Sequence, residues 1–156
     1  MRRKGYYKKK KHESDSKYNR VDMGRFINYL MQGGQKVSAE KILYNSLDYI
    51  KEKTDQDAVE VFEKALDNAS PTLEIVSRRV GGANYQIPRK VRANRKFFLG
   101  AHWIIEAARS GKGEPIHERL ANEFVAASKE EGAAIKKKET VHRMAEANKA
   151  FASFLR

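Results

Sequence analysis

The sequence predicts a mainly α-helical fold, a single-domain bundle of about six helices with a protruding two-stranded β-hairpin arm. Three observations predict it. Apolar residues recur every three or four positions through most of the chain, the stretch at about 72–91 alternates around a Gly-Gly pair, and 156 residues without an internal repeat fit one domain. A chain of this length buries roughly 70% of its unfolded surface, which is enough for one core. We expect a basic N-terminal extension over residues 1–20 and one helical domain, including the arm, over residues 21–156.

The charge balance implies an acidic partner. The chain has 32 Lys and Arg against 20 Asp and Glu, which gives a net charge of +12, and nucleic acid is the commonest partner of so basic a protein. The absence of cysteine excludes disulfides, thiolate zinc sites and cysteine nucleophiles. No apolar run is long enough to span a bilayer and no apolar segment follows the basic N-terminus, so we expect a soluble, unsecreted protein without a membrane partner.

The N-terminal extension, residues 1–20, carries nine Lys and Arg, two Asp and Glu, and no apolar periodicity. Such a segment is expected to be disordered on its own. Tyr6, Tyr7 and Tyr18 lie among the lysines and offer stacking faces to nucleic-acid bases. A solvated tail or a remnant of an expression vector is the alternative, but we favour an arm that folds against phosphates. Its candidate contacts are Arg2, Arg3, Lys4, Lys8, Lys9, Lys10 and Lys11.

Helical periodicity begins at Val21. Two helices are predicted, one on each side of the Gly33-Gly34 break. Asp57, with Glu60 three residues later, forms a capping box that opens a third helix, and Ser70-Pro71 ends it. The apolar stripes indicate core rather than a cofactor site. The expected core positions are Met23, Ile27, Leu30, Met31, Ala39, Ile42, Leu43, Ser46, Leu47, Ile50, Ala58, Phe62, Ala65, Leu66 and Ala69.

A β-hairpin follows, in "TLEIVSRRVGGANYQIPRK". Gly81 and Gly82 suit a two-residue turn because that turn needs positive φ. This turn pairs Val76 with Ile87, Glu74 with Arg89 and Arg78 with Tyr85. A four-residue loop would instead set Val76 against Arg89, which is a poorer match. Strands of about nine residues at ~3.3 Å each would carry the tip ~30 Å from the body.

The tip of this arm has too little apolar surface to pack on the body, so we expect a partner to complete it. An ordinary surface hairpin whose charges only keep it soluble is the alternative, and the single sign of the charge argues against it. The residues concerned are Arg78, Arg79, Gly81, Gly82, Asn84, Tyr85 and Gln86.

Three further helical segments follow the arm. The first should bury Phe98, Ala101, Ile105 and Ala108; the second begins at Pro115, buries Ile116, Leu120, Phe124 and Ala127 and ends at Gly132; the third carries Ile135, Val141 and Met144. Arg92, Arg95 and Lys96 occupy the first turn of the first segment, where cations oppose the helix dipole and therefore suggest an anionic partner. Lys136, Lys137 and Lys138 form either a solvated face or, as we favour, part of one continuous basic footprint.

Catalytic and cofactor motifs are missing from the sequence. "SGKGE" and "GGQKVS" do not match the phosphate-binding loop, so they indicate turns. His12, His102, His117 and His142 are too scattered for metal-ligand spacing. We therefore expect no enzyme activity, no metal, no cofactor and no small-molecule substrate.

Four motifs carry a resemblance to a known family. "SRRVGGANYQIP", "WIIEAAR", "RLANE" and "KKKETVHRMAEANKAFA" resemble, in order and spacing from about Met23 to Phe151, the bacterial-type family of small-subunit ribosomal protein seven. The resemblance implies a six-helix body with a protruding β-ribbon. It also implies binding to the 3′ major domain of the small-subunit ribosomal RNA and nucleation of the subunit head. The main ribosomal-RNA contacts that it implies are Arg2, Arg3, Lys8, Lys9, Lys10, Lys11, Arg92, Arg95 and Lys96.

The resemblance further implies a location near the exit site, where the ribbon and C-terminal region approach messenger RNA and the leaving transfer RNA. The residues concerned are Arg78, Arg79, Gly81, Gly82, Asn84 and Tyr85 at the ribbon tip and Arg143, Lys149 and Phe151 in the C-terminal motif. Small-subunit proteins nine and eleven are the expected protein neighbours. The expected location is the ribosome of the cytoplasm, with an organellar ribosome left open.

The entry to the first helix departs from the family pattern. Where the family usually has a proline-containing "LPDPKYG"-like segment, this chain has "ESDSKYN", with Ser14 and Ser16 for the prolines and Asn19 for the glycine. Proline rigidity is lost there. The path of the N-terminal extension is therefore not fixed by the resemblance.

Two other function classes compete with this interpretation. A DNA-binding architectural protein can also carry a basic ribbon arm, but such arms usually end in an apolar or proline wedge, and this tip offers Gly81, Gly82, Asn84 and Tyr85. An RNA-modifying enzyme would need a catalytic constellation or cofactor loop. The sequence shows neither.

Overall fold

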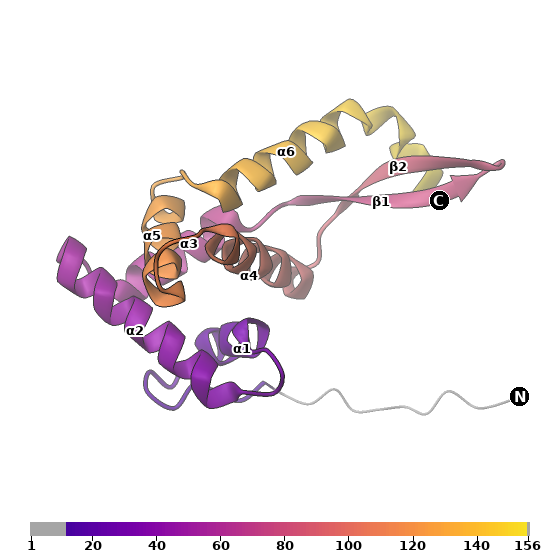
Figure 1. Cartoon of the computed structure of the whole chain (residues 1–156). Helices are drawn as coiled ribbons and strands as arrows, with labels where there is room; N and C mark the ends of the chain where they lie inside the picture. The colour runs from indigo at the N-terminus through magenta and orange to yellow at the C-terminus, as the bar shows by residue number, and fades with distance from the viewer. Residues whose placement is uncertain (1–11, 156) are drawn as a thin grey trace, which may run out of the picture.

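The fold is a helical body from which a two-stranded ribbon extends, as the computed structural model in Figure 1 shows for residues 12–155. This architecture confirms the predicted mainly α-helical bundle with a hairpin arm. The elements are α1 (Val21–Leu30), α2 (Lys36–Thr54), α3 (Ala58–Ala69), β1 (Leu73–Val80), β2 (Ala83–Lys90), α4 (Ala93–Ser110), α5 (Ile116–Ser128), α6 (Ala133–Ala147) and the 3₁₀ helix η1 (Lys149–Leu155).

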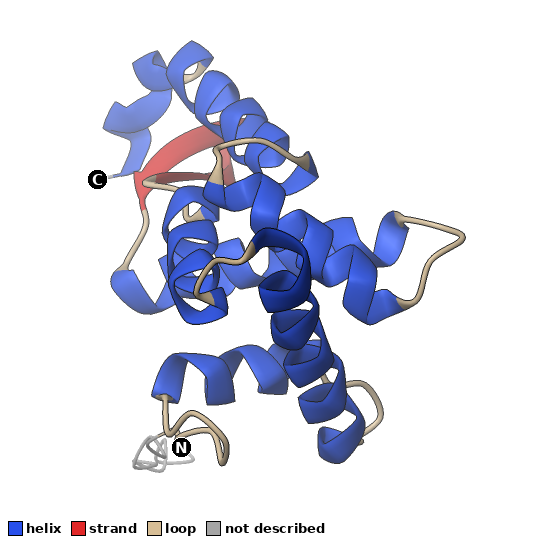
Figure 2. Ribbon diagram, turned by 90° about the vertical axis from the view of Figure 1, so that its left-hand side faces the viewer, coloured by secondary structure: helices blue, strands red, loops and turns tan. Residues whose placement is uncertain are grey.

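The core lies where α5 packs against α2, α3 and α4, and Figure 2 shows these helices gathered on one side of the ribbon. Phe26, Phe62 and Phe124 meet at its centre with ring centroids 5.4–5.5 Å apart, in the edge-on and tilted arrangements that aromatic rings favour. Most predicted core positions are buried. Five are only half-buried, namely Met31, Ile42, Phe98, Ile116 and Val141. Met144 is wrong as a core position because 41% of it is exposed.

The start of α3 and the end of α5 differ in detail from the predicted helix boundaries. Asp57 caps α3 because its Oδ1 accepts a hydrogen bond from the Val59 amide at 3.0 Å, whereas the Glu60 carboxylate lies 3.8 Å from the Lys64 ammonium. The cap is therefore confirmed, and the reciprocal half of the capping box is replaced by an ion pair one turn along. Gly132 does not end α5, which stops at Ser128; it is the N-cap of α6, at a φ of 97°.

The ribbon has the predicted register. Val76 pairs with Ile87, Glu74 with Arg89 and Arg78 with Tyr85, around a turn in which Gly81 and Gly82 have φ of 58° and 90°. The expectation that the tip lacks the apolar surface to pack on the rest of its chain is wrong at Tyr85. The C-terminal helix η1 lies along β2, and the Tyr85 and Phe151 rings are 5.3 Å apart. The chain itself thus stabilises a two-stranded ribbon that would be marginal in isolation.

Residues 13–20 fold onto the body, contrary to the expected disorder of the whole extension. Asp15 is 4% exposed, residues 16–18 form a turn, and Tyr18 packs against the core beside Tyr44 instead of facing solvent as a stacking surface. Residues 1–11, with their seven candidate cations, Tyr6 and Tyr7, lie outside the part of the chain that the structure describes. Within residues 12–155, none of the helices is both long and apolar enough to span a bilayer.

Candidate nucleic-acid interface

The ribbon tip presents exposed cations beside a two-glycine turn. Arg78, Arg79 and Asn84 are exposed together with both turn glycines, while Tyr85 is half-buried against Phe151. The type of turn follows from the sequence, because glycine adopts the positive φ that the turn requires at both positions without strain. The structure therefore brings the predicted tip residues together with Phe151 of the C-terminal motif.

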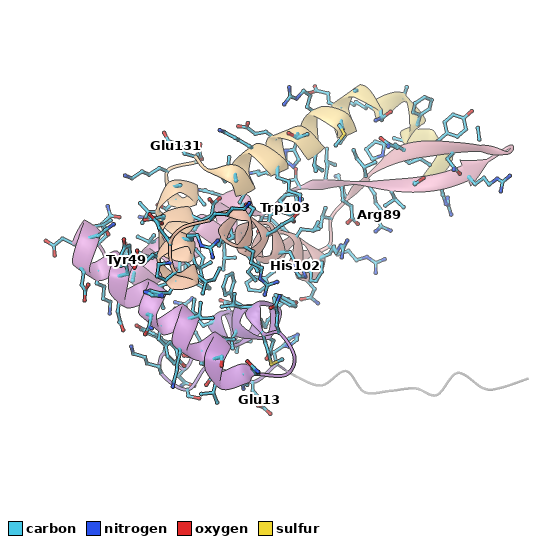
Figure 3. The ribbon with its side chains drawn as sticks, viewed as in Figure 1. Glu13, Tyr49, Arg89, His102, Trp103 and Glu131 are labelled. Atoms are coloured by element: carbon cyan, nitrogen blue, oxygen red, sulfur yellow. The ribbon has the colours of Figure 1, made fainter. Side chains whose placement is uncertain are left out.

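The base of the ribbon is a charged junction centred on Glu74. Its Oε1 accepts a hydrogen bond from Arg89 at 2.5 Å and its Oε2 accepts one from Arg95 at 3.1 Å. Burial of Glu74 opposes its ionisation, but the hydrogen bonds from the two arginines outweigh burial and lower the pKa of its carboxyl. Figure 3 shows Arg89 where the ribbon leaves the body.

The cations at the start of α4 suggest an anionic partner, and Glu74 is that partner for Arg95. The Arg95 guanidinium also lies 4.8 Å from the centre of the Phe98 ring. Arg92, the N-cap residue of α4, is exposed, and Lys96 is half-buried. Half of the Arg89 and Arg95 side-chain surface remains accessible, so both can still meet a phosphate.

A groove lies between the ribbon and the C-terminal helices. Leu73, Pro88 and Ala152 supply apolar lining, and Arg89, Lys90 and Lys149 line it with cations. His142 closes the junction from α6, because its Nε2 is 3.2 Å from the Thr72 amide and accepts its hydrogen bond. Desolvation, helped by Lys138, lowers the pKa of His142, so the neutral ring serves as this acceptor.

The lysine triplet lies at the opposite end of α6 from the ribbon tip (Figure 1). Lys137 Nζ is 2.5 Å from Glu106 Oε2, and Lys138 Nζ donates to the Asn68 carbonyl at 2.6 Å. Lys136 is exposed and, among the described residues, has no ion-pair partner within 4 Å. The triplet is therefore partly committed to the body and lies apart from Arg143 and Lys149, which are exposed beyond it on the chain.

An aromatic patch between α1 and α4 escaped the sequence analysis. Tyr29 lies 5.3 Å from Phe98 and 5.6 Å from His102, centroid to centroid, and the Arg25 guanidinium covers Phe97 at 4.2 Å. These rings are half-buried. The "RKFF" string could have revealed the patch, because it sets an arginine three residues before an aromatic ring on one helical face.

The described residues contain no cluster of three or more His, Asp or Glu side chains able to hold a metal ion. His102 stacks on Tyr29, His142 is an acceptor in the ribbon junction, and His117 lies 3.9 Å from Glu118. Each of these histidines thus has a structural environment of its own. The geometry presents cations and aromatic rings for binding rather than a reaction centre.

Comparison with known proteins gives one consistent result. A family profile described as "Ribosomal protein S7p/S5e" matches residues 2–149. The chain is 52% identical over 91% of its length to "Small ribosomal subunit protein uS7" of Endomicrobium trichonymphae, covering 89% of that protein. It is 49% identical to the protein of that name from Caldanaerobacter subterraneus over 99% of both chains, and 54% identical to the one from Treponema denticola over 90% of both.

Proposed function

The chain belongs to the ribosomal protein S7p/S5e family of structural small-subunit proteins, and from this premise we propose that it is a primary binder of the 3′ major domain of small-subunit ribosomal RNA. Membership gives the coarser function directly: this is a non-enzymatic protein of the small ribosomal subunit that binds the subunit's RNA. The finer proposal is that its binding nucleates assembly of the subunit head. The concentration of exposed cations at the foot of the ribbon carries this proposal.

Cations at three places support ribosomal-RNA anchorage. Arg92, Arg95 and Lys96 surround the N-terminal turn of α4, Lys136 is exposed at the start of α6, and residues 1–11 carry seven more. Contacts with phosphates release condensed counterions, which supplies affinity without reading sequence. Glu74 holds Arg89 and Arg95 at one junction, and about half of each arginine side chain stays exposed, which supports their role as phosphate contacts. We assign Lys137, which is exposed, and Lys138, which is half-buried, to the same surface through their neighbour Lys136.

The ribbon tip and the C-terminal helix form the second part of the proposal. We infer that Arg78, Arg79, Asn84 and Tyr85, with Arg143, Lys149 and Phe151, approach messenger RNA and the leaving transfer RNA near the exit site. The observation in favour is that η1 braces the ribbon, so that a narrow, cationic tip is held away from the body. Small-subunit proteins nine and eleven are the proposed protein neighbours, and a cytoplasmic ribosome is the proposed location.

Purification from native lysate at low salt tests the proposal. We expect the protein to co-sediment with the small ribosomal subunit and to protect the 3′ major domain from chemical probes after reconstitution with purified RNA. Recovery with DNA instead would establish the architectural alternative and overturn this function. Protection of a different domain of the RNA would overturn the finer assignment alone.

A further inference from the structure

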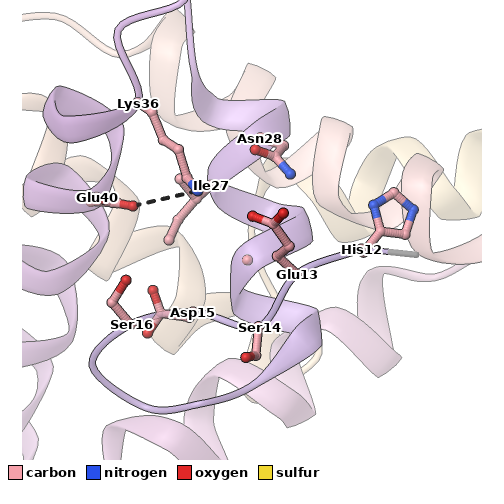
Figure 4. A pocket seen from close by; sticks show the side chains of 10 residues that line it. His12, Glu13, Ser14, Asp15, Ser16, Ile27, Asn28, Lys36 and Glu40 are labelled. Carbon is pink, nitrogen blue, oxygen red and sulfur yellow. Dashed lines mark ion pairs between the residues drawn. The ribbon is translucent and has the colours of Figure 1, made fainter. Parts of the chain in front are cut away.

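A buried carboxylate, Asp15, fixes residues 13–20, which connect residues 1–11 of the basic extension to the body. Asp15 Oδ1 accepts a hydrogen bond from the Tyr44 hydroxyl at 2.5 Å, and its Oδ2 accepts from the amides of Lys17 at 3.1 Å and Tyr18 at 2.9 Å. Desolvation and the bond to Asp15 raise the pKa of Tyr44 to about 12, so the hydroxyl remains a donor throughout the neutral range. Figure 4 shows Asp15 on a loop that curls beside α1, with Glu40 of α2 across the pocket.

The same loop is clamped by backbone contacts. The Asp15 amide donates to the Arg20 carbonyl at 3.0 Å, which closes residues 15–20 into one turn. At Gly24 of α1, a Cβ atom would lie 2.5 Å from the Glu13 carbonyl oxygen, so only glycine lets the chain cross the helix this closely. Residues 13–15 therefore pass directly over the α1 backbone.

Side chains of the turn secure it to α2. Lys17 Nζ lies 3.5 Å from Asp48 Oδ1 and 5.2 Å from the centre of the Tyr44 ring. The Tyr18 ring lies 6.2 Å from the Tyr44 ring. Tyr44 thus contacts the turn through both its hydroxyl and its ring, and this turn comes shortly after residues 1–11 in the sequence.

Anchoring at residue 15 sets the length of the tether. Eleven residues can reach at most about 36–40 Å from His12. Releasing the turn would move the nearest point held by the body from residue 12 to about residue 20, so the chain between that point and the N-terminus would grow from eleven to about twenty residues. The effective concentration of a tethered group falls roughly as the −3/2 power of tether length, which here is about 2.5-fold. Residues 12–20 would also have to be ordered again whenever the extension bound.

We propose that Asp15 and Tyr44 are positioning residues for the basic extension: they contact no RNA themselves, yet they confine the seven cations of residues 2–11 to one side of the body and so strengthen RNA binding. This inference rests on the proposed RNA-binding function. It assigns a role to a carboxylate in a region of positive charge, where direct contact with phosphate would be unfavourable.

A thermodynamic cycle tests it. Affinity for a 3′ major domain RNA fragment is measured for the full chain, for Asp15→Asn and Tyr44→Phe, and for each again after deletion of residues 1–11. We expect each substitution to weaken binding by about 2.5-fold or more in the full chain and to have no effect in the shortened chain. Equal losses in the two backgrounds, or no loss in the full chain, would overturn the inference.

Two control variants separate positioning from charge and from folding. Asp67→Asn, at an exposed carboxylate of α3, makes the same charge change as Asp15→Asn and should leave affinity unaltered. Asn45→Ala changes the exposed neighbour of Tyr44 and should also be silent. Thermal melts identify any variant that fails to fold, and in that case Tyr44→Phe, which removes one oxygen, carries the test.

A measurement on the free protein makes the inference independent of RNA binding. The chain has no cysteine, so Lys4→Cys and Asn45→Cys introduce one defined pair for spin labels. Asp15→Asn should broaden the distance distribution between the labels, and an unchanged distribution would refute the anchor. Broadening in a protein whose unsubstituted form does not bind the RNA would instead identify the proposed function as the part that failed.

Discussion

At the scale of single residues, two buried carboxylates organise donors that lie far apart in the sequence. Asp15 accepts hydrogen bonds from the Tyr44 hydroxyl and two backbone amides, and Glu74 accepts them from Arg89 and Arg95. A buried carboxylate is costly unless its oxygens are satisfied, and both of these are. In a chain of net charge +12, these acidic side chains determine where cationic segments are held.

Only part of this pairing could be predicted from the sequence. Glu74 opposite Arg89 follows from the hairpin register, which the glycine turn fixes locally. The approach of Arg95 depends on the angle at which α4 leaves β2, and the bond from Tyr44 to Asp15 depends on how α2 packs. Neither angle has a local signal, so the sequence alone predicts an external anion for Arg95 and disorder for residues 13–20.

Single-residue contacts also explain two of the departures from the family pattern, at Ser14 and Asn19. Ser14 Oγ donates a hydrogen bond to Asn19 Oδ1 at 2.9 Å, so two of the three substituted positions contact each other. Asn19 has a φ of 51°, a conformation that asparagine adopts more readily than most residues, and this explains why it can stand where the family usually has glycine. A side-chain hydrogen bond here replaces part of the rigidity that proline would supply.

The first prediction concerns Glu74. Glu74→Gln should lower the free energy of unfolding by about 1–2 kcal/mol at pH 7, because it removes two charge-assisted hydrogen bonds whose arginines are half-exposed and can regain water. The measurement is urea denaturation. Glu60→Gln, at an exposed pair on α3, is the matched control and should change stability by less than about 0.5 kcal/mol.

The pH dependence of this difference provides a second check. The folded pKa of Glu74 lies below its ordinary value of 4.5, so its contribution is fully present above pH 4.5 and is lost as the pH falls through the lower folded pKa. The gap between the unsubstituted protein and Glu74→Gln should therefore be constant from pH 7 down to about pH 5 and should shrink below it. A gap that is unchanged in acid would contradict the ion-pair account.

At the scale of elements, local signals predicted well and distant contacts did not. Periodicity located the helices because each apolar stripe is a property of one segment, and the hairpin register follows from Gly81, Gly82 and the match of Val76 with Ile87. The brace of η1 on β2 has no such signal. In the sequence, α4, α5 and α6 lie between Tyr85 and Phe151, so the two rings can meet only after these helices have packed.

The second prediction concerns the ribbon. Replacing Arg78–Tyr85 by Asn-Gly preserves the register, because Ser77 and Gln86 are already paired and an Asn-Gly turn can close them. Subunits should still incorporate the variant, since Arg92, Arg95 and Lys96 remain, whereas reading-frame maintenance or retention of exit-site transfer RNA should suffer. Gradient sedimentation and a frameshifting reporter measure the two effects.

Two comparison variants separate the effect of the tip charges from the effect of the Tyr85–Phe151 contact in this experiment. Arg78→Gln with Arg79→Gln keeps the arm length and the ring contact, while Phe151→Ala removes the ring that meets Tyr85 and keeps the tip cations. If the charge at the tip is responsible, the double arginine variant should reproduce most of the reporter defect. Failure of the shortened ribbon to enter subunits would show that the arm is an assembly anchor and that the division of roles is wrong.

At the scale of the whole molecule, the basic surfaces are spread over elements that meet only in the fold. Residues 13–20 lie beside α1 and α2, the ribbon base adjoins α4, and α6 runs from α5 toward the ribbon tip (Figure 1). The sequence predicted that the charge is positive and which segments carry it. It did not predict which cations have partners within the chain and which stay exposed. Lys137 and Lys138, two members of the predicted basic footprint, also bond to Glu106 and Asn68 within the chain.

The last prediction follows from this distribution of charge. Each phosphate that the protein neutralises should make the logarithm of its RNA affinity fall by about 0.7–0.9 per unit of log salt concentration. Deleting residues 1–11 removes seven cations and should reduce that slope by up to about 5–6. The melting temperature should change little, because the Asp15 turn and the core lie outside the deleted segment. Changing the same seven residues to glutamine, which keeps the segment's length, should reduce the slope equally. A flat salt response of the full chain, or a deletion that melts the body, would contradict an electrostatic role for the extension.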